Sequence, residues 1–350
     1  MKKNDNVKIA SMTRRSALAA GTGMLATPAL VGRAMGQETV NWRVQSHWTQ
    51  SSRSFEDSLG KVASLLAERT DGRFTLELFG SGELASGAEI FELTKRGVVE
   101  MSSFSTGYVP GDVPTGLIAA GIPGIFQAEW EYQHFVKNIG FEDLLNEDLA
   151  QHGLVCRAEK IYSTELVLAR EVTSVDDFRS LKVRSSGGFL EYLSAAGASA
   201  QNIPGPELYQ SVATGVVDGA HWGAAQGAAA LGLYEVAKFH MAPPLGLAMD
   251  IYMMRQDKVD QLPDDLRDVL FNILEERFWE RTVENKLNEI VARENAISTL
   301  GVQVSTFPDD VMAEFRRASQ DIVKAQSAKG ETAVRAVEIL QGFLAQLGRG

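Results

Sequence analysis

The sequence predicts an α/β protein with mainly parallel sheets, two lobes, a long connecting helix and a helical C-terminus. Three observations lead to this class. The chain has 350 residues, enough for two domains of ordinary size. From Thr39 to about Asp250, segments with the period of a strand alternate with segments with the period of a helix. Beyond Asp250 the patterns become long and helical, which indicates two lobes that the chain joins more than once.

The alternation begins at 40–44, where apolar and polar residues alternate as in a strand. A helix follows with Phe55, Leu59, Val62 and Leu66 on one face, and a turn at 70–73 leads to a strand at 74–78. The same reasoning predicts strands at 98–104, 154–157, 166–169 and 181–184, and helices at 88–96, 174–180, 189–196 and 206–214.

Two long helical patterns rich in Glu, Arg, Ala and Leu complete the chain, at 264–299 and 309–347, with a strand-like break at 301–307. The first of them is expected to be the connecting helix. The expected division gives lobe I residues 37–157 plus about 246–282, and lobe II residues 158–245 plus about 300–345.

Residues 1–36 are predicted to be an export signal. Thr13-Arg14-Arg15-Ser16 precedes an apolar stretch at 17–31, and Ala34-Met35-Gly36 has the small residues of a cleavage site. The paired arginines favour the twin-arginine route, although Ala17 stands where Phe or Leu is usual, so an ordinary secretory leader stays open. The stretch is shorter than the ~20 residues of a membrane helix. The expected location is the periplasm.

Charge and cysteine content exclude several classes of protein. The net charge is −11, and removal of residues 1–36 would make it −16, which argues against nucleic acid or an anionic membrane as a partner. Cys156 is the single cysteine and cannot form an internal disulfide; its strand-like surroundings predict a buried, inert thiol. No cofactor is expected from these features.

Motifs of common enzymes are missing from the sequence. It contains no HExxH, GxSxG or GxxxxGK[ST]. The glycines at 80–85 follow a strand, but Thr75 and Glu77 make that strand half exposed, unlike the buried first strand of a dinucleotide-binding fold. A simple turn is the better interpretation, and an enzyme becomes the minority hypothesis.

The mature chain resembles the solute receptors of tripartite ATP-independent periplasmic (TRAP) transporters. The ordered motifs that carry this resemblance are ERTDGR at 68–73, LFGSGEL at 78–84, ELTKRGVVE at 92–100, LKVR at 181–184, GAS at 197–199, ELYQSVATGVVDG at 207–219 and LPDDL at 262–266. Trp222 and the segment LGLYEVAK at 231–238 look most like the α-keto acid and small monocarboxylate receptors. The implied fold is two α/β lobes around a cleft, and the implied partners are a small organic carboxylate and the integral membrane subunits of the transporter.

Arg184 is the leading candidate for the ligand site. It ends a predicted strand just before Ser185-Ser186-Gly187-Gly188, where a glycine-rich turn leaves room, and its planar fork suits a carboxylate. The resemblance implies that this arginine binds the solute, while a surface ion pair is the alternative. Trp222, flanked by small residues, is expected to form a cleft wall or to pack in the core.

His221 departs from the family pattern. The resemblance implies a carboxylate at this place that holds a cation bridging to the solute, and an imidazole is a poor ligand for sodium or calcium. A sodium or calcium ion therefore stays open, with Glu165 and Asp250 as its candidate ligands. His221 could instead donate a hydrogen bond to the solute or serve a structural role.

Further candidates for the site are Glu165, Tyr162, Gln226, His47, Trp48 and Phe126, each with ordinary packing or solvation as the alternative. The resulting prediction is a receptor for a 2-oxo or 2-hydroxy monocarboxylate that acts by lobe closure, with a homodimer left open. The alternatives are an exported lyase or isomerase with Glu165 and His221 as acid and base, and a purely structural exported protein.

Overall fold

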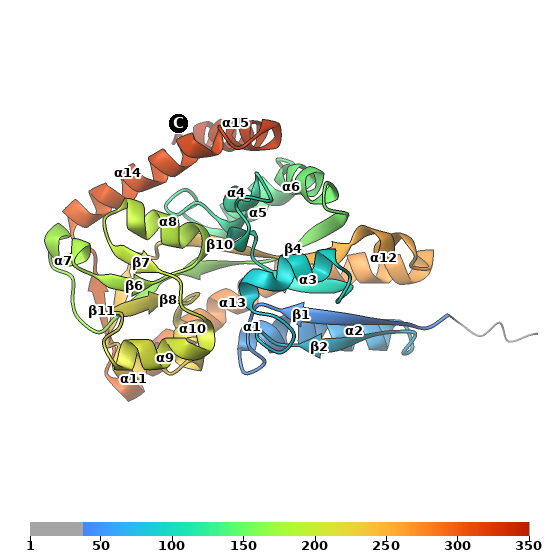
Figure 1. The fold of residues 1–350 in the computed structure, drawn as a ribbon, viewed down its shortest axis with the longest axis horizontal. Coiled ribbons are helices and arrows are strands. Elements are labelled where there is room, and N and C mark those ends of the chain that lie inside the picture. Colours follow the sequence, from blue (N-terminus) through green and yellow to red (C-terminus); the bar gives the residue numbers. More distant parts are fainter. Residues whose placement is uncertain (1–37, 350) are drawn as a thin grey trace, which may run out of the picture. The chain divides into compact units, whose positions relative to one another are not determined.

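A computed structural model describes residues 38–349 of the chain. The expected export signal at 1–36 lies outside the described residues. Within them, eleven strands form two sheets, and each sheet with its helices makes up one lobe (Figure 1). We call the lobe that contains the five-stranded sheet lobe I and the lobe that contains the six-stranded sheet lobe II. The predicted two-lobed α/β fold is thus confirmed.

Lobe I has the strand order β2-β1-β3-β10-β4. Its strands are β1 (Val40–Ser46), β2 (Phe74–Phe79), β3 (Met101–Phe104), β4 (Leu154–Thr164) and β10 (Gly246–Arg255). β1 pairs in parallel with β2 and β3, while β10 runs antiparallel to β3 and β4. The sheet is therefore mixed, and not mainly parallel as the alternation predicted, because β10 returns from lobe II in the opposite direction.

Lobe II has the strand order β11-β9-β5-β8-β6-β7. The strands are β5 (Leu166–Leu168), β6 (Lys182–Arg184), β7 (Ser199–Gln201), β8 (Gly219–His221), β9 (Phe239–Ala242) and β11 (Gln303–Thr306). β6 is parallel to β7 and β8, and β11 is parallel to β9, but β5 is antiparallel to both of its neighbours. This sheet is mixed for the same reason as the first, because β5 enters from lobe I.

The chain passes between the two lobes at four places, the last of them near the C-terminus at residues 327–330. β4 continues into β5 through residue 165, and β9 continues into β10 through residues 243–245. These two crossings are tied together, since the Leu245 amide donates to the Thr164 carbonyl at 2.8 Å. The third passage is α13 (Asp264–Leu300), which packs against β4 of lobe I and α10 (Ala225–Ala230) of lobe II. α13 matches the predicted connecting helix within one residue.

Helices cover the two sheets. In lobe I they are α1 (Arg53–Phe55), α2 (Lys61–Arg69), α3 (Ile90–Lys95), α4 (Gly116–Ala120), α5 (Glu129–Lys137), α6 (Phe141–Ala150) and α12 (Gln256–Asp260), with a π-helical turn at Glu56–Gly60 and 3-10 turns at Gly87–Glu89 and Thr106–Tyr108. In lobe II they are α7 (Val175–Arg179), α8 (Gly187–Ala195), α9 (Gly205–Ala213), α10 and α11 (Leu233–Val236). Ser174 caps α7 through its side chain, which accepts a hydrogen bond from the Asp177 amide.

The C-terminal pattern at 309–347 forms two helices instead of one. α14 (Asp309–Gln326) packs against α7 and α8 of lobe II, whereas α15 (Glu331–Gln346) packs against α6 of lobe I (Figure 1). The chain turns at Gly330, whose φ of +138° is accessible to glycine. The division therefore differs from the expected one, which placed all of 300–345 in lobe II.

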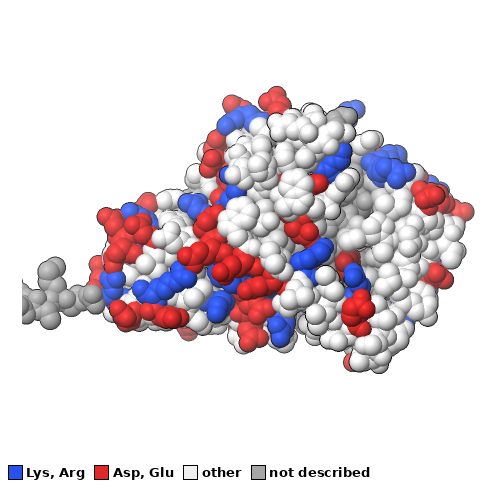
Figure 2. Space-filling view, turned by 180° about the vertical axis from the view of Figure 1, so that it is seen from behind, with Lys and Arg blue, Asp and Glu red and all other residues white. Residues whose placement is uncertain are grey.

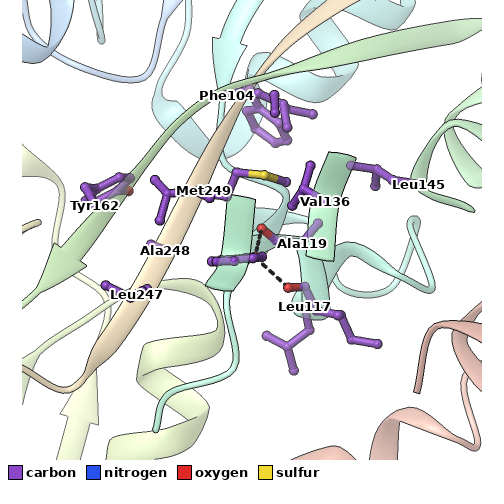
Figure 3. Close-up of a cluster of buried hydrophobic side chains, with 14 of the residues drawn as sticks. Phe104, Leu117, Ala119, Val136, Leu145, Tyr162, Leu247, Ala248 and Met249 are labelled. Atoms are coloured by element: carbon purple, nitrogen blue, oxygen red, sulfur yellow. Dashed lines mark hydrogen bonds between the residues drawn. The ribbon is translucent and has the colours of Figure 1, made fainter. Parts of the chain in front are cut away.

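Part of the lobe I core lies between β10 and the helices α4 and α5. Figure 3 shows Met249 extending from β10 toward Val136 and Phe104, all of which are buried. Ala248, the neighbour of Met249 on the same strand, points to the other face of the sheet, as strand geometry requires. β10 is buried along nearly its whole length, so one strand supplies both a core face and a site face.

Acidic and basic side chains are interspersed on the face in Figure 2, and the acidic ones gather in a band. This distribution agrees with the net charge of −11 and shows no broad basic area on that face. Within residues 38–349, none of the helices combines the length and the apolar character that crossing a membrane requires.

Candidate ligand-binding site

A cavity of about 50 Å³ lies between the lobes. Its walls follow the carboxyl ends of parallel strands, where α/β proteins commonly bind ligands: β1 and β3 in lobe I, and β6 and β8 in lobe II. Lobe I contributes His47, Trp48, Ser105, Gly107, Tyr108, Ala120, Tyr162 and Ala248, and lobe II contributes Arg184, Ser186, Gly187, Gly188, Phe189, His221, Trp222 and Gly223.

Arg184 is the last residue of β6, and its side chain is 2% exposed. Its Nε donates to the Ile203 carbonyl at 2.9 Å, and one terminal nitrogen donates to the His221 carbonyl at 2.7 Å. Burial lowers the pKa of the guanidinium, and Tyr108 opposes this shift, but arginine stays charged in proteins. Within the described residues no carboxylate lies within 4.0 Å of it.

The Trp222 indole lies against this guanidinium. The Arg184 Cζ is 4.6 Å from the centroid of the indole ring, the geometry of a cation–π contact. Glycines at 205 and 227 let the ring approach the backbone, because a Cβ on Gly205 would lie 2.5 Å from the indole. The ring also meets Trp48 of lobe I edge to face, with centroids 5.9 Å apart. Trp222 therefore fixes the orientation of Arg184 at the boundary of the two lobes.

His221 forms the next part of the lobe II wall. Its Nδ1 lies 3.0 Å from the Ser185 hydroxyl oxygen, and its ring packs on Phe189 with centroids 4.8 Å apart. Burial, helped by the positive charge of Arg184, lowers the pKa of His221 to about 3. The imidazole is therefore neutral near pH 7, because the protonated ring would be a second buried cation beside the guanidinium.

Asp250 organises the lobe I wall from behind the cavity. Its carboxylate accepts hydrogen bonds from Trp48 Nε1 at 2.8 Å, Lys160 Nζ at 2.6 Å and the Tyr162 hydroxyl at 3.1 Å, and His47 Nε2 lies 3.2 Å away. Burial alone would raise the pKa of Asp250, but Lys160 and His47 outweigh it and hold the pKa well below its usual range. The charged carboxylate thus fixes two cavity aromatics in place.

Comparison with known proteins identifies the family. Residues 45–329 match the family model described as bacterial extracellular solute-binding protein, family 7. The chain belongs to this family. It is also 25% identical, over 96% of its length and 95% of the relative's, to the monocarboxylate 2-oxoacid-binding periplasmic protein of Nostoc sp. (strain PCC 7120).

Solved structures show the same fold in other solute-binding proteins. A TRAP periplasmic solute-binding protein from Pseudoalteromonas atlantica, with bound sodium and pyruvate, superposes with a TM-score of 0.80 at 23% identity and covers 89% of this chain and 95% of its own. One from Colwellia psychrerythraea, with bound calcium and pyruvate, gives 0.82 at 21% identity with the same coverage. These two structures show the fold, and the family match makes the chain a solute-binding protein and not an enzyme.

Three predicted site residues lie away from the receptor's cavity. Phe126 stacks on Tyr132 at 4.2 Å between centroids and belongs to the lobe I core. Gln226 binds Glu289 of α13 through its backbone amide at 2.7 Å and its side-chain amide at 2.9 Å. Glu165 is the third, and it sits at the crossing from β4 to β5.

Glu165 faces His240 and not His221. Its Oε2 lies 3.0 Å from His240 Nε2, an ion-pair contact outside hydrogen-bond geometry. The other ring nitrogen of His240 lies 2.8 Å from the Tyr234 hydroxyl oxygen. The acid and base pair of Glu165 and His221 that the enzyme hypothesis required is therefore not assembled, in agreement with the family assignment.

The residues present do not fit a hard cation in this cavity. No Asp or Glu is among its lining residues in the described part of the chain. Neither proposed cation ligand reaches it: Asp250 already accepts three hydrogen bonds, and Glu165 faces His240. Across residues 38–349 no group of three or more His, Cys, Asp or Glu side chains is arranged to hold a metal ion.

Sequence reasoning missed several cavity residues, of which Tyr108 and Phe189 are the largest. Tyr108 follows the carboxyl end of β3, and Phe189 lies in the first turn of α8 after the carboxyl end of β6. A rule that searches the segments after parallel strands would have found both.

Proposed function

We propose that this chain is the solute receptor of a TRAP transporter and binds a small monocarboxylate of the 2-oxo or 2-hydroxy class through Arg184. The observation that carries the proposal is the buried guanidinium of Arg184 in a cavity with no acidic lining residue. A lone buried charge is costly, and an organic anion would neutralise it.

The geometry of Arg184 favours a carboxylate over other anions. The Nε and one terminal nitrogen of the guanidinium donate to backbone carbonyls, and the plane of the guanidinium rests on Trp222. The remaining N–H groups therefore have a fixed direction. A fixed planar fork matches the two oxygens of a carboxylate with parallel hydrogen bonds. An uncharged solute would leave the guanidinium without a counter-charge.

The cavity favours a small solute. One water requires about 10–15 Å³ of such volume, so a cavity of about 50 Å³ has room for roughly three to five waters or for a solute of a few heavy atoms. A six-atom 2-oxo acid has an affinity ceiling near 9 kcal/mol, at about 1.5 kcal/mol per heavy atom, so we expect micromolar to sub-micromolar binding. The name of the Nostoc relative supports the 2-oxo acid class.

Lobe closure is the proposed mode of binding. Each lobe supplies half of the cavity wall, so a solute inside it would contact His47, Trp48 and Tyr108 on one side and Arg184 and Trp222 on the other. Such a cavity opens only if the lobes separate, and the crossings at 165 and 243–245 are the natural hinge. The closed form is then what the membrane subunits would recognise. Export to the periplasm remains the prediction from residues 1–36.

A thermal-shift series tests the proposal. Pyruvate, 2-oxobutyrate and lactate should stabilise the purified protein, whereas lactamide, which has the shape of lactate without its charge, should not. Native mass spectrometry of protein purified from cells would report the mass of a retained solute and the oligomeric state. If none of the organic anions stabilises the protein, the assignment is wrong.

Arg184→Gln tests the role of the guanidinium. Hydrogen bonds to charged groups contribute about 1.5–3 kcal/mol each, so losing two should weaken pyruvate binding by about 100-fold to 10,000-fold in isothermal titration calorimetry. Arg179→Gln is the matched control, because Arg179 lies in the same lobe but is exposed and paired with Glu314. Equal affinity of the two variants would remove Arg184 from the site.

A further inference from the structure

The cavity admits one formal negative charge and no additional cation. Arg184 is its one lining residue with a permanent charge among the described residues. No Asp or Glu lines the cavity, His221 is neutral, and His47 lies 3.2 Å from the buried Asp250 carboxylate, which offsets a positive charge on its ring. A bound monocarboxylate brings the total charge to zero. A sodium ion would leave one positive charge buried and a calcium ion two, and buried charges are stable only when they are paired.

The nearby carboxylates cannot supply the missing negative charge. Asp250 is fully buried behind Trp48 and Tyr162 and already balances Lys160, whose ammonium is 2.6 Å from the Asp250 carboxylate. Lys160 also donates to Glu159 at 3.1 Å, and His47 Nε2 lies 3.2 Å from Asp250, so Lys160 and His47 together face the two acids. Turning Asp250 toward the cavity would leave Lys160 short of a partner and release Trp48.

His221 offers a hydrogen-bond donor to a solute in the cavity, which it lines. Its Nδ1 faces the Ser185 hydroxyl at 3.0 Å, and its Nε2 has no hydrogen-bond partner in residues 38–349. When Ser185 donates to Nδ1, the ring proton of the neutral imidazole is on Nε2. Hard cations prefer oxygen ligands, so the imidazole suits the solute better than it suits sodium or calcium.

We propose that this receptor binds its monocarboxylate without a metal cation, and that the neutral imidazole of His221 donates a hydrogen bond to the solute in the cation's place. The inference rests on the proposed function and deepens it. It sets this site apart from the two solved relatives whose structures contain pyruvate together with sodium or calcium.

Titration calorimetry with pyruvate in three buffers tests the inference. The solute-free protein is titrated in a choline chloride buffer with EDTA, in a sodium chloride buffer of equal ionic strength, and in the choline buffer with calcium in place of EDTA. We expect dissociation constants that agree within about twofold, because no cation takes part. A loss of about tenfold or more in the EDTA buffer would overturn the inference.

Two variants test the role of His221. His221→Glu places a carboxylate beside the solute, so its binding should weaken at least about tenfold in the EDTA buffer and recover with calcium. His221→Gln is the neutral control, and its affinity should fall below that of the wild type by the same factor in all three buffers. The assigned role would be refuted if calcium did not change the affinity of His221→Glu for pyruvate, or if His221→Gln bound pyruvate as tightly as the wild type.

The two proposals fail in different ways. Pyruvate binding that appears only with sodium or calcium would overturn the cation-free site and leave the receptor function intact. The absence of binding by any 2-oxo or 2-hydroxy acid in all three buffers would overturn the receptor function and the inference with it. Circular dichroism of each variant verifies that a lost signal is not a loss of fold.

Discussion

Gly187→Ala should weaken solute binding by obstructing the closure of the lobes. Gly187 begins α8 in lobe II, and a Cβ built on it would lie 2.6 Å from the carbonyl oxygen of Gly107 in lobe I. The backbone fixes the positions of both the new Cβ and the Gly107 oxygen, so no side-chain rotation relieves the overlap. The lobes must instead move apart, and overpacking of this kind costs about 1–3 kcal/mol.

That cost falls on the closed form. Since a tenfold change in affinity corresponds to about 1.4 kcal/mol, the apparent dissociation constant for pyruvate should rise about 5-fold to 150-fold. Isothermal titration calorimetry measures the affinity. Small-angle X-ray scattering measures closure, because the decrease in radius of gyration on adding solute should become smaller in the variant.

Gly215→Ala separates obstruction from backbone strain. Gly187 and Gly215 both have left-handed backbones, with φ of +54° and +73°, so an alanine costs about 1–2 kcal/mol of local strain at either position. A Cβ on Gly215, however, would meet nothing within 4 Å. Gly215→Ala should therefore lower the melting temperature and leave binding unchanged. Equal affinities of the two variants would refute the closure argument.

Three further substitutions follow from the geometry. Gly205→Ala should weaken pyruvate binding about tenfold in calorimetry, because the new methyl group would displace the Trp222 indole without touching the solute. Gly111→Ala is the control and should bind pyruvate as the wild type does, because a Cβ at this position would have open space around it. Asp250→Asn should lower the unfolding free energy measured in urea by about 3 kcal/mol or more, because it removes the closest counter-charge of the buried Lys160 ammonium. A loss below about 1 kcal/mol would contradict the role of Asp250 as the partner of Lys160. Burial raises the pKa of Glu289 to about 7, so its contribution to stability is present below about pH 4.5 and is lost as the pH rises through about 7. Glu289→Gln should therefore gain stability relative to the wild type between about pH 5 and 8. If urea titrations show the same difference in unfolding free energy at every pH, this effect is excluded.

The alternation of periods was enough to predict most of the elements near the site. β1, β6 and α13 follow from local patterns, and the site residues after β1 and at the end of β6 follow from the strands. The same patterns missed β10, which is buried along nine of its ten residues and so shows no alternation. A strand covered on both faces is usually a continuous run of apolar residues. In β10 this run is interrupted by Asp250, whose burial is compensated by Lys160.

The misplaced residues depended on partners far away in the sequence. Glu165 looked free to face the cleft because nothing near it in the chain reveals that β9 places His240 beside it. Phe126 lies in a loop, and only the packing of α5 shows that its ring stacks on Tyr132. Arg184 was predictable for the opposite reason, because its surroundings are set locally by the strand end and the glycine turn that follows.

The charge of Arg184 would couple solute binding to lobe closure. Closing the lobes around an empty cavity removes water from a guanidinium that has no acidic partner among residues 38–349, so charge alone favours the open form. A bound carboxylate neutralises this charge and makes closure favourable, and a solute shifts an equilibrium only by its differential affinity for the two forms. Lobe closure would then select the solute by charge and by size together. A neutral solute would not offset the charge of Arg184, and a large solute would hold the lobes apart. An additional cation would weaken this coupling, because it would restore the unpaired positive charge that the carboxylate removes.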